Sequence, residues 1–174
     1  IASSVENARL YEELAAREHR MEEDLAAARE LQRLLVPDRW PDIEGLEIAS
    51  GYRPAREISG DVYDFYEHRE EQVLLAFGDV SGKGAAAALY GSLVNGLLRS
   101  LAPRRRSPSD LMRLMNEALL ERKVEARYVT LLLMLWNFRT YEFTMANAGA
   151  IPPMICRAGE VVRVRAEGVP LGLL

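Results

Sequence analysis

Two short acidic clusters contain the residues of this sequence that could do chemistry. The first is Gly60-Asp61-Val62-Tyr63-Asp64, and the second is Gly78-Asp79-Val80-Ser81-Gly82-Lys83-Gly84. Side chains alternate along a strand, so Asp61 and Tyr63 are expected on one face, and Val62 and Asp64 on the other. Only one carboxylate of the first cluster can therefore face a given site.

The second cluster follows an apolar run, at the point where a helix is expected to begin. There the Asp79 carboxylate and exposed backbone carbonyls could meet a hard cation. Two aspartates without His or Cys nearby suit Mg²⁺ or Mn²⁺ better than Zn²⁺, and flanking glycines allow close backbone approach. The ordinary alternative is that these residues only form turns or cap a helix. A Walker A loop does not fit, because Gly78 and Gly82 enclose three residues instead of four and Gly84 follows Lys83.

The elements that must position these residues fall into two parts, residues 1–36 and 37–174. Residues 1–36 lack Gly and Pro and repeat apolar residues at three- and four-residue steps, which predicts one long amphipathic helix. Such a helix favours a dimeric coiled coil, and packing back onto its own domain is the alternative. Pro37 and Pro41 end it.

The second part reads as strands, two helices, then strands again, which is an α+β order. The segments with strand patterns are 46–52, 62–66, 73–77, 128–136, 141–146, 154–156 and 161–165. Helices are expected over 85–101 and 108–123, the second with Ser107 as its cap and Pro108 in its first turn. The basic run 104–106 between them is expected to be a solvated loop, or else a docking patch for an acidic partner.

Composition limits the classes of function. The chain has 174 residues, 49% hydrophobic and 28% charged, as expected for one globular domain with an appendage. No apolar run approaches the roughly 20 residues of a membrane span, and a signal peptide is not expected, because the first forty residues carry many charges. A net charge of −4 gives no reason to expect nucleic-acid binding. The single cysteine, Cys156, favours the cytoplasm and is expected to pack as a small apolar residue.

Several segments, in the right order, resemble one known family. Residues 57–65 resemble the glycine-glycine-aspartate-aromatic-tyrosine-aspartate signature of the phosphatase domain of sporulation stage II protein E-type (SpoIIE) signalling proteins. Residues 79–84 match that family's aspartate-valine-serine-glycine-lysine-glycine signature. Residues 146–153 resemble its alanine-asparagine-alanine-glycine-histidine segment before two prolines, and 168–172 match a further segment.

The resemblance implies a protein phosphatase 2C-like (PPM) fold, a four-layer α-β-β-α sandwich with two Mn²⁺ or Mg²⁺ ions between its sheets. By position, Asp61 would ligate one ion, Asp79 would bridge both, and the Val80 carbonyl would complete the set with waters. The implied reaction is attack of activated water on a phosphoserine or phosphothreonine. Gly82 and Lys83 would be possible phosphate or substrate contacts, although an exposed lysine at a helix start is an equally ordinary reading.

The resemblance also implies partners. Residues 29–37 resemble the linker helix that enters such domains, and 7–11 resemble the last helix of a GAF-type sensor, so an upstream sensor domain and a homodimer are expected. The implied substrate is a phosphorylated anti-sigma-factor antagonist of the STAS type, in bacterial partner-switching signalling.

The sequence departs from the family pattern in three places, and two of these departures, Ala150 and the missing C-terminal aspartates, favour a rival function. Ser59 replaces a glycine, which would strain the backbone if that position needs a positive φ, and Ala150 replaces the histidine. Only His19 and His68 are present, so a histidine general acid at this site is not expected. The family's later threonine-aspartate-glycine segment and final aspartate do not occur before Leu174, so the sandwich is expected to be incomplete and this chain to bind metal weakly, with little turnover. The rival is a catalytically impaired module that dimerises or binds a partner.

Overall fold

A four-stranded antiparallel sheet forms the centre of the domain. The computed structural model describes residues 2–37, 39–54, 58–69, 71–104 and 106–174, with side chains from residue 5 onward. The strands lie in the order β1 (Asp61–Arg69), β2 (Gln72–Val80), β3 (Val129–Asn137) and β4 (Glu142–Ala148). Each strand therefore lies beside its neighbour in sequence, and the helices α2 (Gly84–Leu101) and α3 (Pro108–Glu121) come between β2 and β3.

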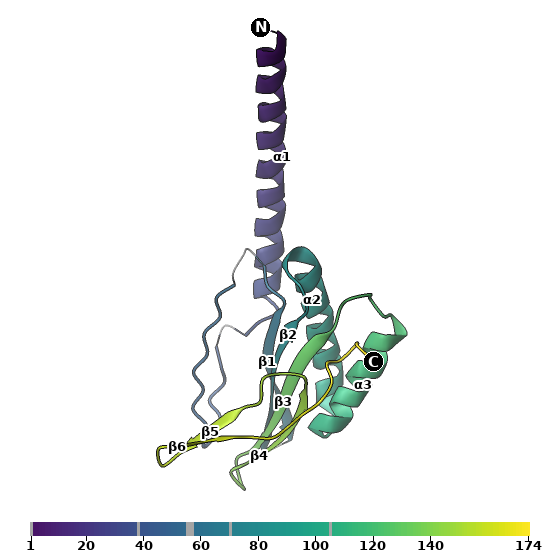
Figure 1. Cartoon of the computed structure of the whole chain (residues 1–174). Coiled ribbons are helices and arrows are strands. Elements are labelled where there is room, and N and C mark those ends of the chain that lie inside the picture. Colours follow the sequence, from purple (N-terminus) through teal and green to yellow (C-terminus); the bar gives the residue numbers. More distant parts are fainter. Residues whose placement is uncertain (1, 38, 55–57, 70, 105) are drawn as a thin grey trace.

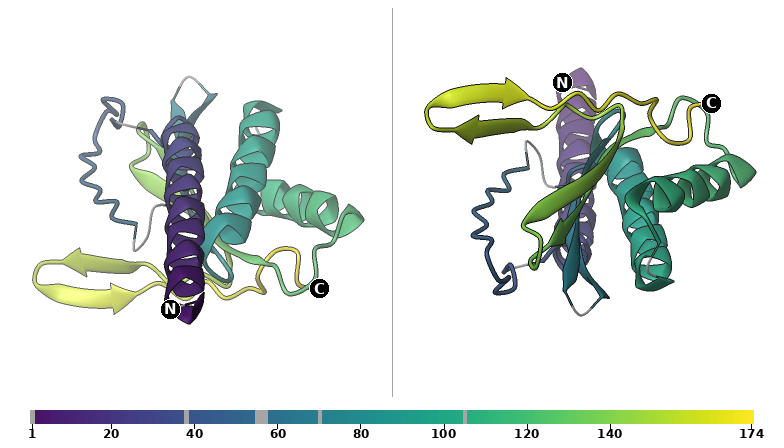
Figure 2. Two further views of the ribbon diagram at one scale, coloured as in Figure 1. Left: turned by 90° about the horizontal axis from the view of Figure 1, so that it is seen from above. Right: turned by 90° about the horizontal axis from the view of Figure 1, so that it is seen from below.

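Both of these helices cover the same face of the sheet, as Figures 1 and 2 show. Alternating strand residues point toward them and form the main core, whose fully buried side chains include Leu74, Val94, Leu98, Met115, Leu131 and Leu133. The expected start of α3 is confirmed, since Ser107 accepts a hydrogen bond from the Asp110 amide and Pro108 begins the helix. A short 3₁₀ helix, η1 (Ala102–Arg104), follows α2.

The N-terminal helix α1 (Ala2–Arg33) projects away from the domain (Figure 1). Its last turns touch the domain, where Leu25 and Ala28 are partly buried. Further toward the N-terminus, Leu10, Leu14 and Met21 are 50%, 53% and 60% exposed. The prediction of one long helix is confirmed, and the alternative that it packs back on its own domain is wrong for this N-terminal part. Within the described residues, no helix is both long and apolar enough to cross a membrane.

The opposite face of the sheet is covered by the segment between α1 and β1. Trp40, Ile43, Leu46 and Ile48 pack there against apolar side chains of the strands. The strand predicted over 46–52 is wrong, because the chain forms no ladder there and has only an isolated bridge between Ile43 and Leu46. Its apolar alternation reflects packing across a sheet face instead of pairing at a sheet edge.

A two-stranded sheet, β5 (Met154–Arg157) and β6 (Glu160–Arg163), projects from the domain (Figure 2). Every residue of both strands is exposed. Cys156 lies in β5 and is exposed as well, so the expectation that it packs as a small apolar residue is wrong. The described residues thus form a helical layer, one main sheet and a separate hairpin.

Candidate metal centre

The two candidate ligands Asp61 and Asp79 lie directly opposite each other on neighbouring strands. Asp61 is the first residue of β1, and in the antiparallel register it pairs with Asp79 near the end of β2. Directly opposed residues of a sheet present their side chains on the same face, with Cβ atoms about 5 Å apart. Both residues are exposed, so water and ions can reach this end of the sheet. The expectation that adjacent strands place the two carboxylates on one face agrees with this geometry.

The electrostatics of this pair suit a cation. Partial burial raises the pKa of Asp79 above its ordinary value, the negative charge of Asp61 raises that pKa further, and a hydrogen bond from the Val80 amide lowers it. Among the described residues, neither carboxylate forms an ion pair with Lys, Arg or His. Two carboxylates that repel each other without a cationic side chain form an oxygen-only donor set of the kind Mg²⁺ and Mn²⁺ prefer.

Two carboxylates are few ligands for a metal centre. Within the described part of the chain, no group of three or more His, Cys, Asp or Glu residues gathers where it could hold an ion. Asp61 and Asp79 would therefore need backbone carbonyls and water to complete a coordination shell of six oxygens, as hard cations usually require.

Hydrogen bonds to the segment before β3 fix the loop that follows Asp79. Ser81 donates its amide to the Tyr128 carbonyl (2.9 Å) and accepts the Tyr128 amide at its hydroxyl (3.1 Å). Arg127 donates from Nη1 to the Ser81 carbonyl at 2.7 Å. The Val80 carbonyl, next to this anchored residue, is therefore held at the same end of the sheet as the two carboxylates.

Gly82 and Lys83 connect this loop to α2. Gly82 has a φ of +96°, and a side chain there would collide with the Arg127 guanidinium, so both its conformation and its space require glycine. Lys83 occupies the residue before α2, is exposed and makes no capping hydrogen bond with its side chain. Its position next to the loop leaves its ammonium free to approach an anion or simply to remain in solvent.

Two glycines bring α2 close to the start of β1. A Cβ atom on Gly60 would lie 3.1–3.3 Å from atoms of Val80 and Ala87, and one on Gly91 would lie 3.2 Å from the Gly60 carbonyl oxygen. Side chains at either position would push the helix away from Asp61. The role of Gly91 was missed by sequence reasoning, because a glycine inside an apolar helix gives no signal of its partner.

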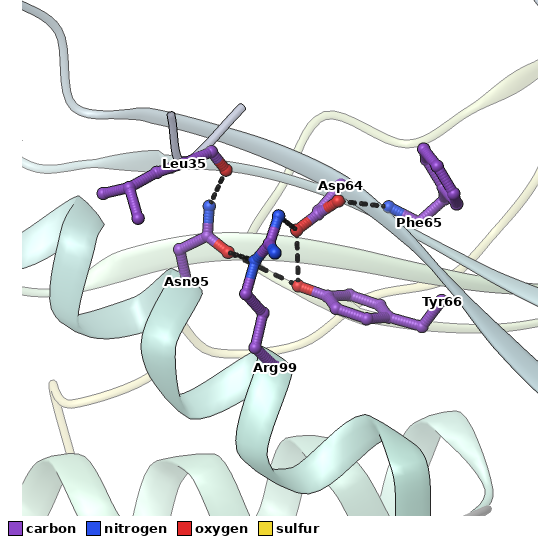
Figure 3. Close-up of polar contacts among 6 residues, drawn as sticks. All are labelled: Leu35, Asp64, Phe65, Tyr66, Asn95 and Arg99. Carbon is purple, nitrogen blue, oxygen red and sulfur yellow. Dashed lines mark hydrogen bonds and ion pairs between the residues drawn. The ribbon is translucent and has the colours of Figure 1, made fainter. Parts of the chain in front are cut away.

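Asp64, the second carboxylate of the first cluster, does not belong to the site. It is 2% exposed on the opposite face of β1, where Arg99 of α2 forms an ion pair with it at 2.9 Å (Figure 3). Tyr66 donates to the same Asp64 oxygen at 3.0 Å, and the Phe65 amide donates to the other at 2.9 Å. Burial raises the pKa of Tyr66 far above its ordinary value, and the Asp64 charge adds to this, so Tyr66 remains a donor.

The same network extends to the end of the N-terminal helical segment. Asn95, which is 3% exposed on α2, donates from its side-chain amide to the Leu35 carbonyl, and Arg99 donates from Nε to Asn95 Oδ1 at 3.4 Å (Figure 3). Strand β1, helix α2 and the residues after α1 are therefore joined by buried polar contacts. These contacts lie behind the sheet face that carries Asp61 and Asp79.

Sequence reasoning missed the contacts that three further residues make around the pair. Ser59 donates its hydroxyl to Asp61 Oδ2, and Gln32 of α1 hydrogen-bonds the Ser59 backbone. Thr130 lies opposite Asp79 on β3 and donates to the Asp79 carbonyl at 3.2 Å. Finding Thr130 requires the register of β2 against β3, and finding the Gln32–Ser59 contact requires knowing that two segments 27 residues apart meet. Residue types alone do not supply either.

Neither histidine lies near the pair. His19 is exposed on α1 beside Glu23, and His68 is buried near the far end of β1, seven residues from Asp61 or roughly 23 Å along the strand. Ala150, which replaces the family histidine, lies in a turn where Asn147 both donates to its carbonyl and accepts its amide. The expectation that no histidine acts as a general acid at the aspartate pair stays a prediction.

The backbone at Ser59 is unstrained. Among the described residues other than glycine, positive φ values occur only at Ala126, Tyr141 and Ala158. Ser59 therefore adopts an ordinary conformation, and the strain that its replacement of a glycine could have caused is absent.

Comparison with known proteins identifies the family to which this chain is similar. Residues 69–174 match the family model described as "Stage II sporulation protein E (SpoIIE)". The phosphoserine phosphatase RsbU of Bacillus subtilis (strain 168) is 30% identical over 129 residues, which cover 74% of this chain and 38% of that protein. The chain therefore spans well under half the length of this relative.

Solved structures share the fold. The SiaA-PP2C domain of Pseudomonas aeruginosa matches 91% of this chain and 65% of its own, with a TM-score of 0.74 and 19% identity. The PP2C phosphatase domain of SpoIIE from Bacillus subtilis, solved with a fragment of its regulatory domain, matches 67% of this chain and 34% of its own, with a TM-score of 0.59 and 25% identity. The expected phosphatase 2C-type fold is confirmed, and the chain belongs to the SpoIIE family.

Proposed function

We propose that this chain carries the phosphatase domain of a bacterial signalling protein, one that hydrolyses phosphoserine or phosphothreonine in a partner protein with Mn²⁺ or Mg²⁺. The observation that carries the proposal is the direct pairing of Asp61 with Asp79 across β1 and β2, at an exposed end of the sheet, in a member of the SpoIIE family. RsbU, a relative named as a phosphoserine phosphatase, supports the class of substrate.

In this proposal each residue has a stated role. Asp61 would hold one ion, Asp79 would bridge two, and the Val80 carbonyl would join them, while Lys83 and the Gly82 backbone would meet the phosphate. A bound pair of such ions supplies Lewis acidity, which activates water and neutralises phosphoryl oxygens. The solved structure of RsbX, whose fold is similar with a TM-score of 0.55, contains magnesium and supports this choice of metal.

The proposed partners rest on the resemblance to the SpoIIE family and on α1. The substrate would be a phosphorylated anti-sigma-factor antagonist, and α1 would connect the domain to an upstream sensor. The exposed apolar residues of α1 support a homodimer. A single cysteine supports a cytoplasmic location.

The test is phosphate release from a phosphoserine peptide by the full 174-residue chain, with and without Mn²⁺. We expect slow, Mn²⁺-dependent turnover that Asp61→Asn and Asp79→Asn each remove. The matched control is Asp42→Asn, because Asp42 is also exposed but lies outside the site. Turnover that is equal in the wild type and both site variants would contradict the proposal.

A second candidate function is favoured by the small donor set. Two carboxylates, with no third acidic or imidazole group gathered around them in the described residues, suit a weak metal site in a module that binds its partner without hydrolysing it. Mn²⁺ binding that depends on Asp61 and Asp79, without release of phosphate, would support this alternative over catalysis.

A further inference from the structure

The Ser59 hydroxyl makes two hydrogen bonds with Asp61. Its Oγ donates to Asp61 Oδ2 at 2.6 Å and accepts the Asp61 backbone amide at 3.2 Å. An exposed aspartate at the start of a strand would otherwise exchange among rotamers. The two contacts instead restrain both the backbone and the carboxylate of Asp61, and in the described residues no hydrogen bond reaches Asp61 Oδ1.

Ser59 is itself held from α1. Gln32 donates from Nε2 to the Ser59 carbonyl at 2.6 Å and accepts the Ser59 amide at Oε1 at 3.0 Å. The amide nitrogen and oxygen of the Gln32 side chain thus bind the C=O and the N–H of the same residue, Ser59. Both residues are partly buried. The hydroxyl therefore approaches Asp61 from a fixed position.

We propose that Ser59 is a positioning residue for the metal ligand Asp61, engaging Oδ2 so that Oδ1 faces the position shared with Asp79. The proposal rests on the proposed function, because it requires Asp61 to bind the cation. Hydrogen bonds to a ligating carboxylate orient it, and their loss typically weakens metal binding about 10- to 100-fold. Ser59 touches neither the cation nor the substrate and acts only through Asp61.

The experiment is a Mn²⁺ titration of the full chain, followed by paramagnetic broadening of backbone amide NMR signals around residues 61 and 79. This readout detects weak binding, reports where the ion binds and needs no catalytic turnover. We expect Ser59→Ala and Ser59→Gly, which both remove the hydroxyl, to raise the Kd for Mn²⁺ about 10-fold. Ser59→Thr keeps the hydroxyl and is expected to restore a Kd close to that of the wild type.

Control measurements separate positioning from folding and from the metal centre itself. Each variant's circular dichroism spectrum and metal-free melting temperature establish that it is folded, and rescue by Ser59→Thr is not expected of a merely structural role. If folded Ser59→Ala and Ser59→Gly bind Mn²⁺ as tightly as the wild type, while Asp79→Asn does not bind, the positioning role is wrong and the metal centre stands. If Asp61→Asn and Asp79→Asn both keep the wild-type Kd, the metal centre is wrong and the role of Ser59 falls with it.

Discussion

At the scale of single residues, the aspartate pair lowers the stability of the metal-free fold at neutral pH, and a bound cation would remove this effect. Burial and the charge of Asp61 both raise the pKa of Asp79 in the folded state above its ordinary value of 3.8. A carboxyl group whose pKa rises on folding favours the folded state below its unfolded pKa. That contribution is lost as the pH rises through the folded pKa. At neutral pH the pair therefore destabilises the metal-free protein.

We therefore predict that Asp79→Asn raises the melting temperature of the metal-free protein at pH 7. The difference from the wild type should shrink as the pH falls toward 3.8, where the wild-type carboxyl becomes protonated. Saturating Mn²⁺ should reverse the order, because ligand bound to the folded state stabilises it and the variant lacks a ligand. Thermal unfolding at both pH values, with and without Mn²⁺, makes the measurement.

The control for this prediction is Asp42→Asn, which removes the same charge from an exposed loop outside the pair. It should leave both the pH dependence and the response to Mn²⁺ unchanged. A metal-free Asp79→Asn variant that melts below the wild type at pH 7 would show that the carboxylates do not repel each other as described.

At the scale of elements, the buried network around Asp64 joins β1, α2 and the segment after α1 (Figure 3). Asp64→Ala would leave the Phe65 amide without an acceptor and the Tyr66 hydroxyl with only its long 3.4 Å hydrogen bond to Asn95 Oδ1, whereas the half-exposed Arg99 could turn to water. We predict a loss of about 3 kcal/mol in the free energy of unfolding for Asp64→Ala and about 1 kcal/mol for Tyr66→Phe. Urea denaturation measures both.

Glu67→Ala is the matched control for these variants, since Glu67 is an exposed carboxylate on the same strand. Its effect should stay within about 0.5 kcal/mol. A cost for Asp64→Ala as small as that of Glu67→Ala would mean that the network does not hold these elements together.

Sequence patterns predicted most of these elements because local rules govern them. Helix periodicity, the Ser107 cap and apolar strand runs are properties of neighbouring residues, and the structure confirms α1, α2, α3 and the strands of the main sheet. The strand over 46–52 was wrong because alternation also arises where an extended segment crosses a sheet face. Contacts such as Gln32 with Ser59 depend on how α1 meets the domain, which no local pattern specifies.

The candidate site, like the elements, was predictable only where local rules apply. Strand alternation correctly separated Asp61 from Asp64, since it depends only on the period of the chain. The exact opposition of Asp61 and Asp79 follows from the register of β1 against β2, and that register is set by the connection and by the core residues on the other face. The assignment of these residues as metal ligands stays a prediction.

At the scale of the whole molecule, α1 is long and projecting, and one stripe along it is apolar except at Glu18 and Gln32. Leu14, Met21, Ala28 and Leu35 recur every seven residues, and Tyr11 and Leu25 fall on the same stripe. The domain partly covers Leu25, Ala28 and Leu35, whereas Tyr11, Leu14 and Met21 remain exposed. A second copy of α1 would cover these exposed residues in a coiled coil, and a seven-residue spacing is the one that such packing requires.

We predict that the 174-residue chain forms a dimer whose stability depends on this stripe. Replacing both Leu14 and Met21 by Lys places two charges in the seam and should convert the dimer to a monomer, while the domain stays folded because both side chains are more than half exposed. Ala16→Lys adds the same kind of charge on the outer face of α1 and should leave the dimer intact. Sedimentation equilibrium over a range of protein concentrations distinguishes the two masses, and a wild-type chain that remains monomeric throughout would overturn the prediction.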